Sequence, residues 1–468
     1  MSRFSLNYLG IFFILISGLS FFNIIYSYYF NLYLNIDTYF FTLLISLIIG
    51  VVFLVKKKEE KKISIYEKIL IVIIGYIVLP FIISIPYYLS IYNISLLDCY
   101  FEAISGFTST GFTIFENVKH LDESLILWRS TSQWIGGIYF LFSILLLIDI
   151  FDNNLKKSLT NFISINTSEI FKQSIKILIL YSSLTLVLFL ILNLINVRAF
   201  DAFNLSMTII SSGGFLPVNN IDVVINSNFK EIIFAMLMLV SFFSLFLTYN
   251  IIFFKKRSLN FYVEDFYLFI YFVSLVAIFF IFFNFNYDYS SIFFSLVSSI
   301  SNIGISLNDT PSNLYFIFLV LVIIGGSFFS TSSGLRFLKL YSLIKFSINE
   351  LLSHSRPKHL YINKFYFSDT NIERSDLYKY FLSVLIFVIS LFIVWFLLTI
   401  SNIEIEAAFK LAILTLMNTV NSSMYNLSDI SFFNMSFITK LILIIFMIIG
   451  RVELLTVLIL CKKFLFKK

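Results

Sequence analysis

The segment SGFTSTGFT, Ser105 to Thr113, places hydroxyl side chains around two glycines inside a very apolar chain. Carbonyl and hydroxyl oxygens are the groups that replace water around a monovalent cation in a narrow pore. Glycine lets the backbone turn its carbonyls toward such a pore, because without a Cβ it adopts positive φ at little cost. The residue types therefore suit a cation-binding loop, although one such cluster between apolar segments is also typical of an ordinary turn.

The same pattern occurs in three places at a constant offset. A glycine stands thirteen residues after the start of DCYFEAISGFTSTGF, DAFNLSMTIISSGGF and SIFFSLVSSISNIGI, which gives Gly111, Gly214 and Gly304. Internal repetition of this kind indicates a repeated structural unit. Three copies at one offset favour a repeated cation-binding loop over three ordinary turns.

A fourth copy, EAAFKLAILTLMNTVNSSMY, is degenerate. It has no glycine, and none occurs between Asn402 and Ile449. An alignment made on Val420 places Asn421 at the glycine position, whereas an alignment made on Phe409 places Val420 there. The sequence leaves this register open by one residue, and it leaves open whether the fourth loop functions like the others.

Long apolar segments surround these loops. Hydrophobic residues make up 59% of the 468 residues and charged residues only 13%, which excludes an ordinary soluble globular protein. A bilayer core of about 30 Å requires roughly 20 apolar residues per helix. We expect an all-α polytopic membrane protein with about ten transmembrane helices, in the runs 7–33, 38–55, 66–90, 130–150, 173–197, 231–254, 264–284, 313–335, 378–400 and 435–460.

Basic residues mark one side of the membrane. They cluster between alternate apolar runs, at Lys56, Lys57, Lys58, Lys61 and Lys62, at Lys156 and Lys157, at Lys255, Lys256 and Arg257, and at Lys462, Lys463, Lys467 and Lys468. The positive-inside rule places these clusters in the cytoplasm. We therefore expect a multi-pass protein of the bacterial inner membrane, in contact with the lipid bilayer, with both termini cytoplasmic. A nucleic-acid-binding patch is disfavoured.

Each loop lies in a unit of span, short helix, loop and span. A helix of a dozen residues is too short to cross a bilayer, and non-helical backbone at that depth must be buried in protein or line a polar cavity. Four such units predict a single-chain, pseudo-tetrameric pore. The boundaries that we expect are 1–62 for two extra N-terminal helices, 63–160, 161–258 and 366–468 for pore repeats 1, 2 and 4, and 259–365 for pore repeat 3 with a gating loop and a cytoplasmic segment.

Four motifs, in order along the chain, resemble the Trk/Ktr/HKT superfamily of potassium uptake systems. They are DCYFEAISGFTSTGFT, WRSTSQWIGG from Trp128, GGSFFSTSSGLRFLK from Gly325, and GRVELLT from Gly450. The chain is most similar to the TrkH-type membrane subunit, which has two extra N-terminal helices. The resemblance implies inward potassium transport driven by the membrane potential, in a homodimer whose protomers each have their own pore.

The resemblance also assigns a selectivity filter, with three residues from each loop. These are Ser109, Thr110 and Gly111; Ser212, Gly213 and Gly214; Asn302, Ile303 and Gly304; and Thr419, Val420 and Asn421. In this superfamily, glycine at the four filter positions is associated with potassium preference, and serine in the first loop with sodium passage. Gly111 favours potassium, whereas the fourth loop keeps a sodium or weakly selective monovalent-cation pathway open as the alternative.

Two features are expected beneath this filter. GGSFFSTSSG would interrupt a helix, and the resemblance implies a gate there, formed by Gly325, Gly326, Ser330, Thr331 and Gly334. A simple kink is the alternative. An arginine within a span is costly and usually faces the bundle interior. The resemblance makes Arg451 an electrostatic barrier in the pore, and the alternatives are snorkelling or pairing with Glu453.

Residues 336–364 contain six basic residues and one acidic residue. This segment could be a membrane-surface helix, whereas the resemblance suggests a docking face for a cytoplasmic nucleotide-binding regulatory subunit. The chain itself has no dinucleotide fingerprint or P-loop and no Cys/His metal spacing. We expect no cofactor, potassium as substrate, and no enzymatic activity. A membrane-embedded enzyme is the remote alternative, and an inverted-repeat transporter is disfavoured because all four units share one orientation.

Overall fold

The structure is a computed structural model that describes residues 3–55, 64–147, 170–253, 263–282, 288–308, 310, 312–353, 374–428, 430–452 and 456. The basic clusters named above, the acidic residue Glu453 and the basic residues between 354 and 364 lie outside the described residues. Our inferences on them stay predictions.

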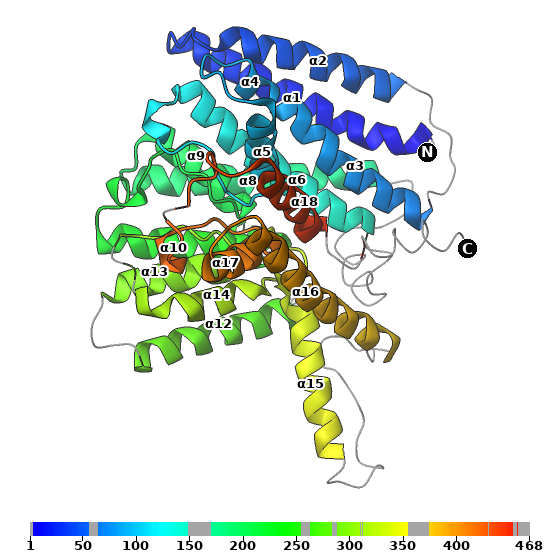
Figure 1. The fold of residues 1–468 in the computed structure, drawn as a ribbon, viewed down its shortest axis with the longest axis vertical. Coiled ribbons are helices and arrows are strands. Elements are labelled where there is room, and N and C mark those ends of the chain that lie inside the picture. Colours follow the sequence, from blue (N-terminus) through cyan, green and yellow to red (C-terminus); the bar gives the residue numbers. More distant parts are fainter. Residues whose placement is uncertain are drawn as a thin grey trace.

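Two N-terminal helices, α1 (Arg3–Tyr29) and α2 (Ile36–Val55), pack against each other as a hairpin. Four repeats follow (Figure 1). Repeat 1 contains α3 (Ile65–Ile83), α4 (Ile85–Tyr88), α5 (Leu96–Phe107) and α6 (Glu123–Leu147), and repeat 2 contains α8 (Ile170–Leu194), α9 (Ala199–Ser211), α10 (Asn228–Phe242) and α11 (Leu245–Ile252). Repeat 3 contains α12 (Val263–Phe282), α13 (Tyr289–Ile300), α14 (Tyr315–Ile323), the two-residue strands β1 (Ile324–Gly325) and β2 (Leu335–Arg336), and α15 (Phe337–Ser353). Repeat 4 contains α16 (Arg374–Ile400), α17 (Ile405–Leu416) and α18 (Phe437–Val452).

Every predicted apolar run contains a helix. Within the described part of the chain, seven helical segments are long and apolar enough to cross a membrane, and they begin at Asn7, Ile36, Ile65, Glu123, Ser174, Glu264 and Leu377. The runs at 231–254 and 313–335 are interrupted, and the run at 435–460 extends beyond the described residues. The chain is a multi-pass membrane protein.

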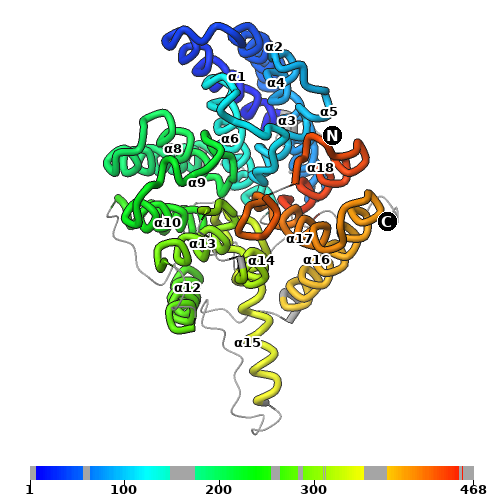
Figure 2. Tube along the Cα trace, turned by 60° about the vertical axis from the view of Figure 1, so that its left-hand side comes forward, coloured from blue at the N-terminus to red at the C-terminus, as the bar shows by residue number. Residues whose placement is uncertain are grey.

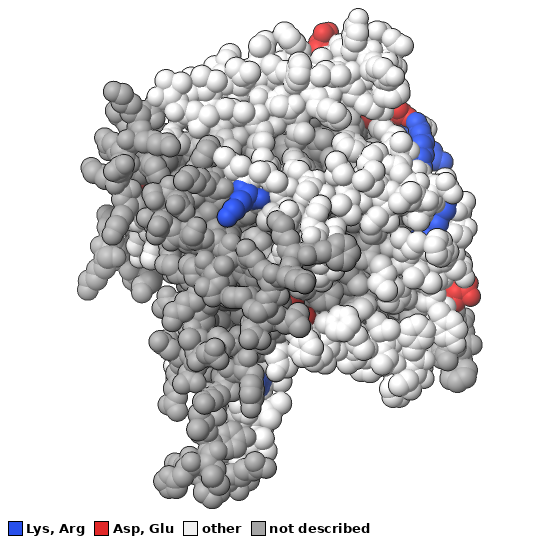
Figure 3. Space-filling model, turned by 180° about the vertical axis from the view of Figure 1, so that it is seen from behind, with Lys and Arg blue, Asp and Glu red and all other residues white. Residues whose placement is uncertain are grey.

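The outer surface agrees with a lipid environment. Large apolar side chains such as Phe266, Phe381 and Phe396 are more than half exposed. Charged side chains are sparse over the described surface in Figure 3. A contiguous apolar surface of this kind is rare in soluble proteins and is typical of a membrane-facing or partner-facing surface.

The repeats form a closed ring. The second span of each repeat packs against the short helix of the next: α6 on α9, α10 on α13, α14 on α17, and α18 on α5. Figure 2 shows the repeats arranged around a common centre. Their order around the ring is therefore 1, 2, 3, 4, so that repeats 2 and 4 face each other across it.

Two of the second spans are broken. The predicted break in repeat 3 is confirmed, because α14 ends at Ile323 and a non-helical segment follows it. In this segment β1 and β2 pair in parallel and enclose a loop, and we call residues 324–336 the hairpin although its two strands are not antiparallel. The break between α10 and α11, at Phe243 and Ser244, was not predicted from the sequence. Beyond the hairpin, α15 extends away from the bundle (Figure 1).

Candidate functional site: a ring of four loops

The four short helices end in the same backbone geometry. Just beyond the end of each short helix, a single residue adopts the left-handed conformation, with φ between 47° and 59°. These residues are Ser109, Ser212, Asn302 and Asn418. The N–H of the residue that follows the left-handed one donates to the carbonyl five residues before it. Thr110 bonds to Ser105 in this way at 2.9 Å, and Thr419 bonds to Leu414 at 3.0 Å. This is a Schellman-type helix end, and it gives all four loops the same starting direction.

This geometry fixes the register of the fourth loop. Thr419 occupies the position of Thr110, and Val420 occupies the position of Gly111. The alignment that placed Asn421 at the glycine position is therefore wrong by one residue, and the alternative alignment is correct. The helix end, rather than the residue types after it, sets the register. Asn421 lies one step further, and its amide donates to the carbonyl of Leu427 at 3.2 Å.

The residues at the glycine position converge on one point. A Cβ on Gly111 would lie 2.8 Å from the Cα of Gly214, and a Cβ on Gly304 would lie 2.8 Å from the carbonyl oxygen of Val420. Gly111 and Gly304 have φ of +87° and +78°, a conformation that side chains disfavour. Loops from all four repeats thus meet, and they do so with backbone rather than side chains in three of the four.

A cavity of about 620 Å³ opens above this meeting point, on the side away from the hairpin. We call it the vestibule. Its lining includes Gly111, Gly214 and Val420, together with the carboxylates of Glu116 and Asp222. Acidic groups in a cleft raise the local concentration of cations. The vestibule therefore gives a cation a polar path from the protein surface to the ring.

Side chains of the left-handed residues connect neighbouring loops. Ser212 donates to the carbonyl of Ser301 at 2.5 Å, in repeat 3. Asn302 reaches the hydroxyl of Thr419 at 3.4 Å, in repeat 4. Asn418 donates to the hydroxyl of Thr110 at 3.0 Å, in repeat 1. These three bonds link the loops of repeats 2, 3, 4 and 1 in that order, through the side chains of Ser212, Asn302 and Asn418.

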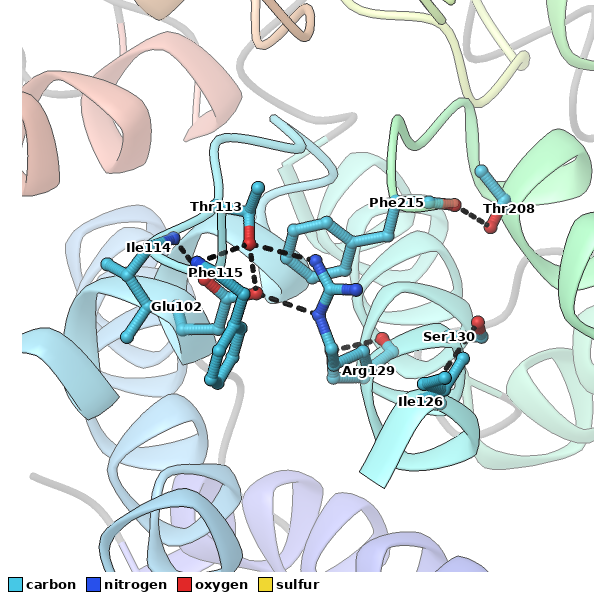
Figure 4. Close-up of polar contacts among 10 residues, drawn as sticks. Glu102, Thr113, Ile114, Phe115, Ile126, Arg129, Ser130, Thr208 and Phe215 are labelled. Carbon is cyan, nitrogen blue, oxygen red and sulfur yellow. Dashed lines mark hydrogen bonds and ion pairs between the residues drawn. The ribbon is translucent and has the colours of Figure 1, made fainter. Parts of the chain in front are cut away.

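A buried ion pair supports the first loop (Figure 4). Arg129 of α6 pairs with Glu102 of α5 at 2.9 Å, and both side chains are almost fully buried. Arg129 also donates to the hydroxyl of Thr113 at 2.9 Å, and Glu102 accepts from the N–H of Ile114 at 2.9 Å. The guanidinium lies 4.3 Å from the ring centre of Phe215, in the second loop. The pair thus fixes the chain that leaves the first filter segment.

The second and third loops have a different support. Thr208 donates to the carbonyl of Phe215 at 2.9 Å, and Ser298 donates to the carbonyl of Ile305 at 2.6 Å. In each case a hydroxyl on the short helix binds the residue just after the glycine. The amide of Gln133, with its oxygen facing the second loop, also accepts from the N–H of Gly214 at 3.2 Å. These supporting residues were not predicted from the sequence, because helix hydroxyls and a buried glutamine are common in any core.

The hairpin of repeat 3 lies beneath the ring and bonds to the break in repeat 2. Ser327 N–H donates to the carbonyl of Phe242, and Leu245 N–H donates to the carbonyl of Phe329, both at 3.0 Å. Thr331 donates to the carbonyl of Ile210 at 2.7 Å, at the end of α9. The backbone groups freed by the two breaks therefore satisfy each other, as buried backbone requires.

The predicted gate residues lie in this hairpin. A Cβ on Gly326 would lie 2.2 Å from the carbonyl oxygen of Phe242, and a Cβ on Gly325 would lie 2.2 Å from that of Ser333. Gly334 has φ of +79°. Ser330 donates within the hairpin to the carbonyl of Ser327 at 2.7 Å. These glycines permit the close approach of three backbone segments.

Two adjacent carboxylates at the start of α12 hold both broken segments. Asp265 accepts from the N–H of Ser244 at 3.0 Å, in the break of repeat 2. Glu264 accepts from the N–H of Phe328 at 2.9 Å, in the hairpin. Neither residue was predicted from the sequence, because acidic residues at the start of a helix are common there for reasons of helix polarity alone.

Arg451 lies between the ring and the hairpin. Its guanidinium donates to Ser333 of the hairpin and approaches the hydroxyl of Ser109 at 3.4 Å. It also stacks over Phe140, 3.9 Å from the ring centre, and is only 2% exposed. The Arg451 side chain therefore does not snorkel to the membrane surface. The guanidinium places a positive charge directly under the ring.

Comparisons with known proteins bear on this arrangement. Residues 308–467 match the sequence profile of the TrkH family, described as a cation transport protein. An uncharacterized cation transporter of Methanocaldococcus jannaschii is 26% identical over 348 residues, which is 71% of each chain. The Trk system potassium uptake protein TrkH of Escherichia coli K12 is 26% identical over 426 residues, which is 86% of each chain.

The fold also has a counterpart among solved structures. The crystal structure of the potassium transporter TrkH from Vibrio parahaemolyticus superposes with a TM-score of 0.80, over 98% of both chains, at 21% identity. At this identity the likeness concerns the fold. It extends to the N-terminal helix pair as well as to the four repeats.

Proposed function

Because this chain belongs to the TrkH family, a type of membrane subunit in the Trk/Ktr/HKT superfamily, we propose that it takes up potassium through its ring of four loops. The observation that carries this proposal is the convergence of four equivalent loops at the floor of a vestibule lined by acidic and polar groups. The family is one of transporters and not of enzymes. Potassium is the substrate rather than a resident cofactor.

The chemistry of transfer follows from the ring. An ion leaving the vestibule loses water, and backbone carbonyls of the filter segments supply oxygens in its place. The C-terminal ends of the four short helices point toward the ring, and their partial negative charge favours a cation there. Arg451 then opposes passage from below, which slows an ion that has crossed the ring, until the hairpin and Arg451 rearrange.

Sodium or weakly selective monovalent-cation transport is the second candidate. Val420 at a glycine position is the observation that favours it, because Gly111 and Gly304 adopt positive φ at this position and Val420 does not. Uptake of ⁸⁶Rb⁺ in competition with potassium or sodium separates the two. Competition by potassium alone supports the first candidate, and equal competition supports the second.

The orientation and the assembly belong to the same proposal. Both termini are cytoplasmic, which puts the hairpin and α15 on the cytoplasmic side of the bacterial inner membrane. The chain works as a homodimer with a cytoplasmic nucleotide-binding regulatory subunit. Several relatives are named as proteins of a Trk system, and α15 extends from the bundle with Ile344, Ile348 and Leu351 at least half exposed on one side. Retention of a regulatory subunit by the purified chain, and its loss when Ile348 is changed to Lys, would support this docking surface.

Complementation tests the function. Expression of the chain in a bacterium that lacks potassium uptake systems should restore growth at low potassium, with and without a co-expressed regulatory subunit. Gly111→Ser should abolish rescue, because the serine Cβ would contact the second loop. Gly18→Ser is the matched control, since nothing lies within 4 Å of a Cβ at that site. Rescue by Gly111→Ser as strong as by the control would contradict the assignment of the ring.

A further inference from the structure

The side chain of Val420 lies at the centre of the ring. The three atoms nearest to a Cβ on Gly214 all belong to Val420, with its Cβ at 2.3 Å. Because a C–C bond is about 1.5 Å long, the Cα of Gly214 is within about 3.8 Å of the Val420 Cβ, which is van der Waals contact.

This contact crosses the ring. Gly214 belongs to repeat 2 and Val420 to repeat 4, and these repeats face each other in the order set by the helix packing. Val420 also faces the other two repeats, since a Cβ on Gly111 would lie 3.0 Å from its Cβ and a Cβ on Gly304 would lie 3.1 Å from its Cγ1. An ion passing through the ring has to pass between opposite loops. With Val420 in this place there is no room for one.

We propose that Val420 is a hydrophobic gate inside the filter, and that an ion crosses the ring only when the fourth loop moves this side chain aside. The inference rests on the proposed cation pathway and adds a closing element to it. Rotation about χ1 does not open the ring, because the Cβ itself makes the contact and does not move in such a rotation. Hydrophobic constrictions close ion pathways by excluding water.

The fourth loop lacks two side-chain supports that hold other loops, which leaves it freer to move. Leu411 stands where the first loop has Glu102, and Leu414 stands where the third loop has Ser298. The side chain of neither leucine can form a hydrogen bond with the backbone of the loop. The fourth loop is instead held by Asn418, through Thr110 and through the carbonyl of Met447 at 2.9 Å. The bonds from Asn302 to Thr419 and from Asn421 to Leu427 are longer, at 3.4 and 3.2 Å.

Flux measurements test the gate. Proteoliposomes of the full chain, of Val420→Ala and of Val420→Gly would be compared for ⁸⁶Rb⁺ uptake. We expect uptake to rise in that order, by about tenfold or more for Val420→Gly, which corresponds to only about 1.4 kcal/mol in barrier height. Val273→Ala, at a lipid-exposed position of α12, is the matched control and should leave uptake unchanged.

A double-mutant cycle tests the contact without any flux. Gly214→Ala should lower the melting temperature, because its methyl group meets Val420, and Val420→Gly should restore it. Gly18→Ala is the control for a glycine in open space. Additive effects of Gly214→Ala and Val420→Gly would overturn the proposed contact.

The outcomes separate this inference from the proposed function. Equal uptake by the native chain and Val420→Gly overturns the gate and leaves the cation pathway standing. If neither passes Rb⁺, K⁺ or Na⁺ although both melt cooperatively, the cation pathway itself is contradicted, and the gate with it. Higher uptake in Val420→Gly supports both.

Discussion

The first and fourth loops begin with the same helix end and differ in the residues that follow it and that hold the loop. The first loop has a glycine with φ of +87° and a buried ion pair behind it, whereas the fourth has a valine at the glycine position and leucines at the supporting positions. Both nevertheless leave their helices through the same Schellman-type end. The helix end therefore determines where each loop starts and its register, whereas the residues that follow determine its conformation and how firmly it is held.

The largest expected effect on ion uptake comes from adding a methyl group at Gly304, where it would meet different atoms than at Gly214. Gly304→Ala should lower Rb⁺ uptake by about a hundredfold or more, since its methyl group would lie 2.8 Å from a backbone oxygen and its φ is +78°. Unlike Gly214→Ala, it should not be rescued by Val420→Gly, because the two nearest atoms are the Cγ2 of Thr419 at 2.6 Å and the Val420 carbonyl oxygen, which that change leaves in place. Rescue of uptake in the double variant would show that side-chain crowding alone distinguishes these positions.

The ion pair of the first loop should matter most to stability. Glu102→Gln leaves the buried charge of Arg129 without its partner, which costs about 3–5 kcal/mol in comparable buried pairs. Thermal unfolding in detergent would measure this. Glu123→Gln removes the more exposed pair with Arg198 and serves as the control, for which we expect a loss of at most about 1 kcal/mol. Equal melting temperatures for the two variants would contradict the supporting role of the first pair.

Loosening the hairpin should affect closure and not selectivity. Asp265→Asn weakens the bond to Ser244, and Glu264→Gln weakens the bond to Phe328. We expect basal Rb⁺ uptake without a regulatory subunit to rise by roughly three- to tenfold, because each change weakens a hydrogen bond, and such a bond contributes about 0.5–1.5 kcal/mol. The ratio of potassium to sodium competition should stay constant. A change in that ratio would mean that these carboxylates act on the filter instead.

The smallest expected effect comes from exchanging supports between loops. Leu414→Ser places a hydroxyl where Ser298 stands in the third loop, and it should tether the fourth loop and lower uptake a few-fold, as one hydrogen bond of about 0.5–1.5 kcal/mol would do. Ser298→Ala, which removes such a bond, should lower the melting temperature slightly. An increase in uptake for Leu414→Ser would argue against movement of the fourth loop.

Much of the fold could be predicted from the sequence. Length and hydropathy predict ten apolar runs and four short helices of about a dozen residues each. Helices of 12 or 13 residues are found at all four places. Gly325 and Gly326 predicted the break in repeat 3, because adjacent glycines followed by a cluster of polar residues destabilise a continuous helix inside a span. The break at Ser244 had no such signal, since it depends on partners from the hairpin and α12.

The site was predictable only where backbone geometry leaves a residue signature. Gly111 and Gly304 need glycine for their positive φ, and both were found. The register of the fourth loop was not, because Val420 stands where the other three loops have glycine, so that the sequence offers no marker for the position. Glu102 and Arg129 are 27 residues apart and meet only through the packing of α5 on α6. Pairings of this kind depend on tertiary structure rather than on local sequence.

The most direct test of the proposed ion pathway is an anomalous difference map from crystals of the full chain grown in rubidium. We predict an Rb⁺ peak at the floor of the vestibule, against the loop segments that contain Gly111 and Gly214, on the opposite side of Val420 from Arg451. In Val420→Gly crystals the density should continue through the ring. A ring without Rb⁺ in both, with ordered Rb⁺ only elsewhere in the protein, would contradict the claim that the four loops form the ion pathway.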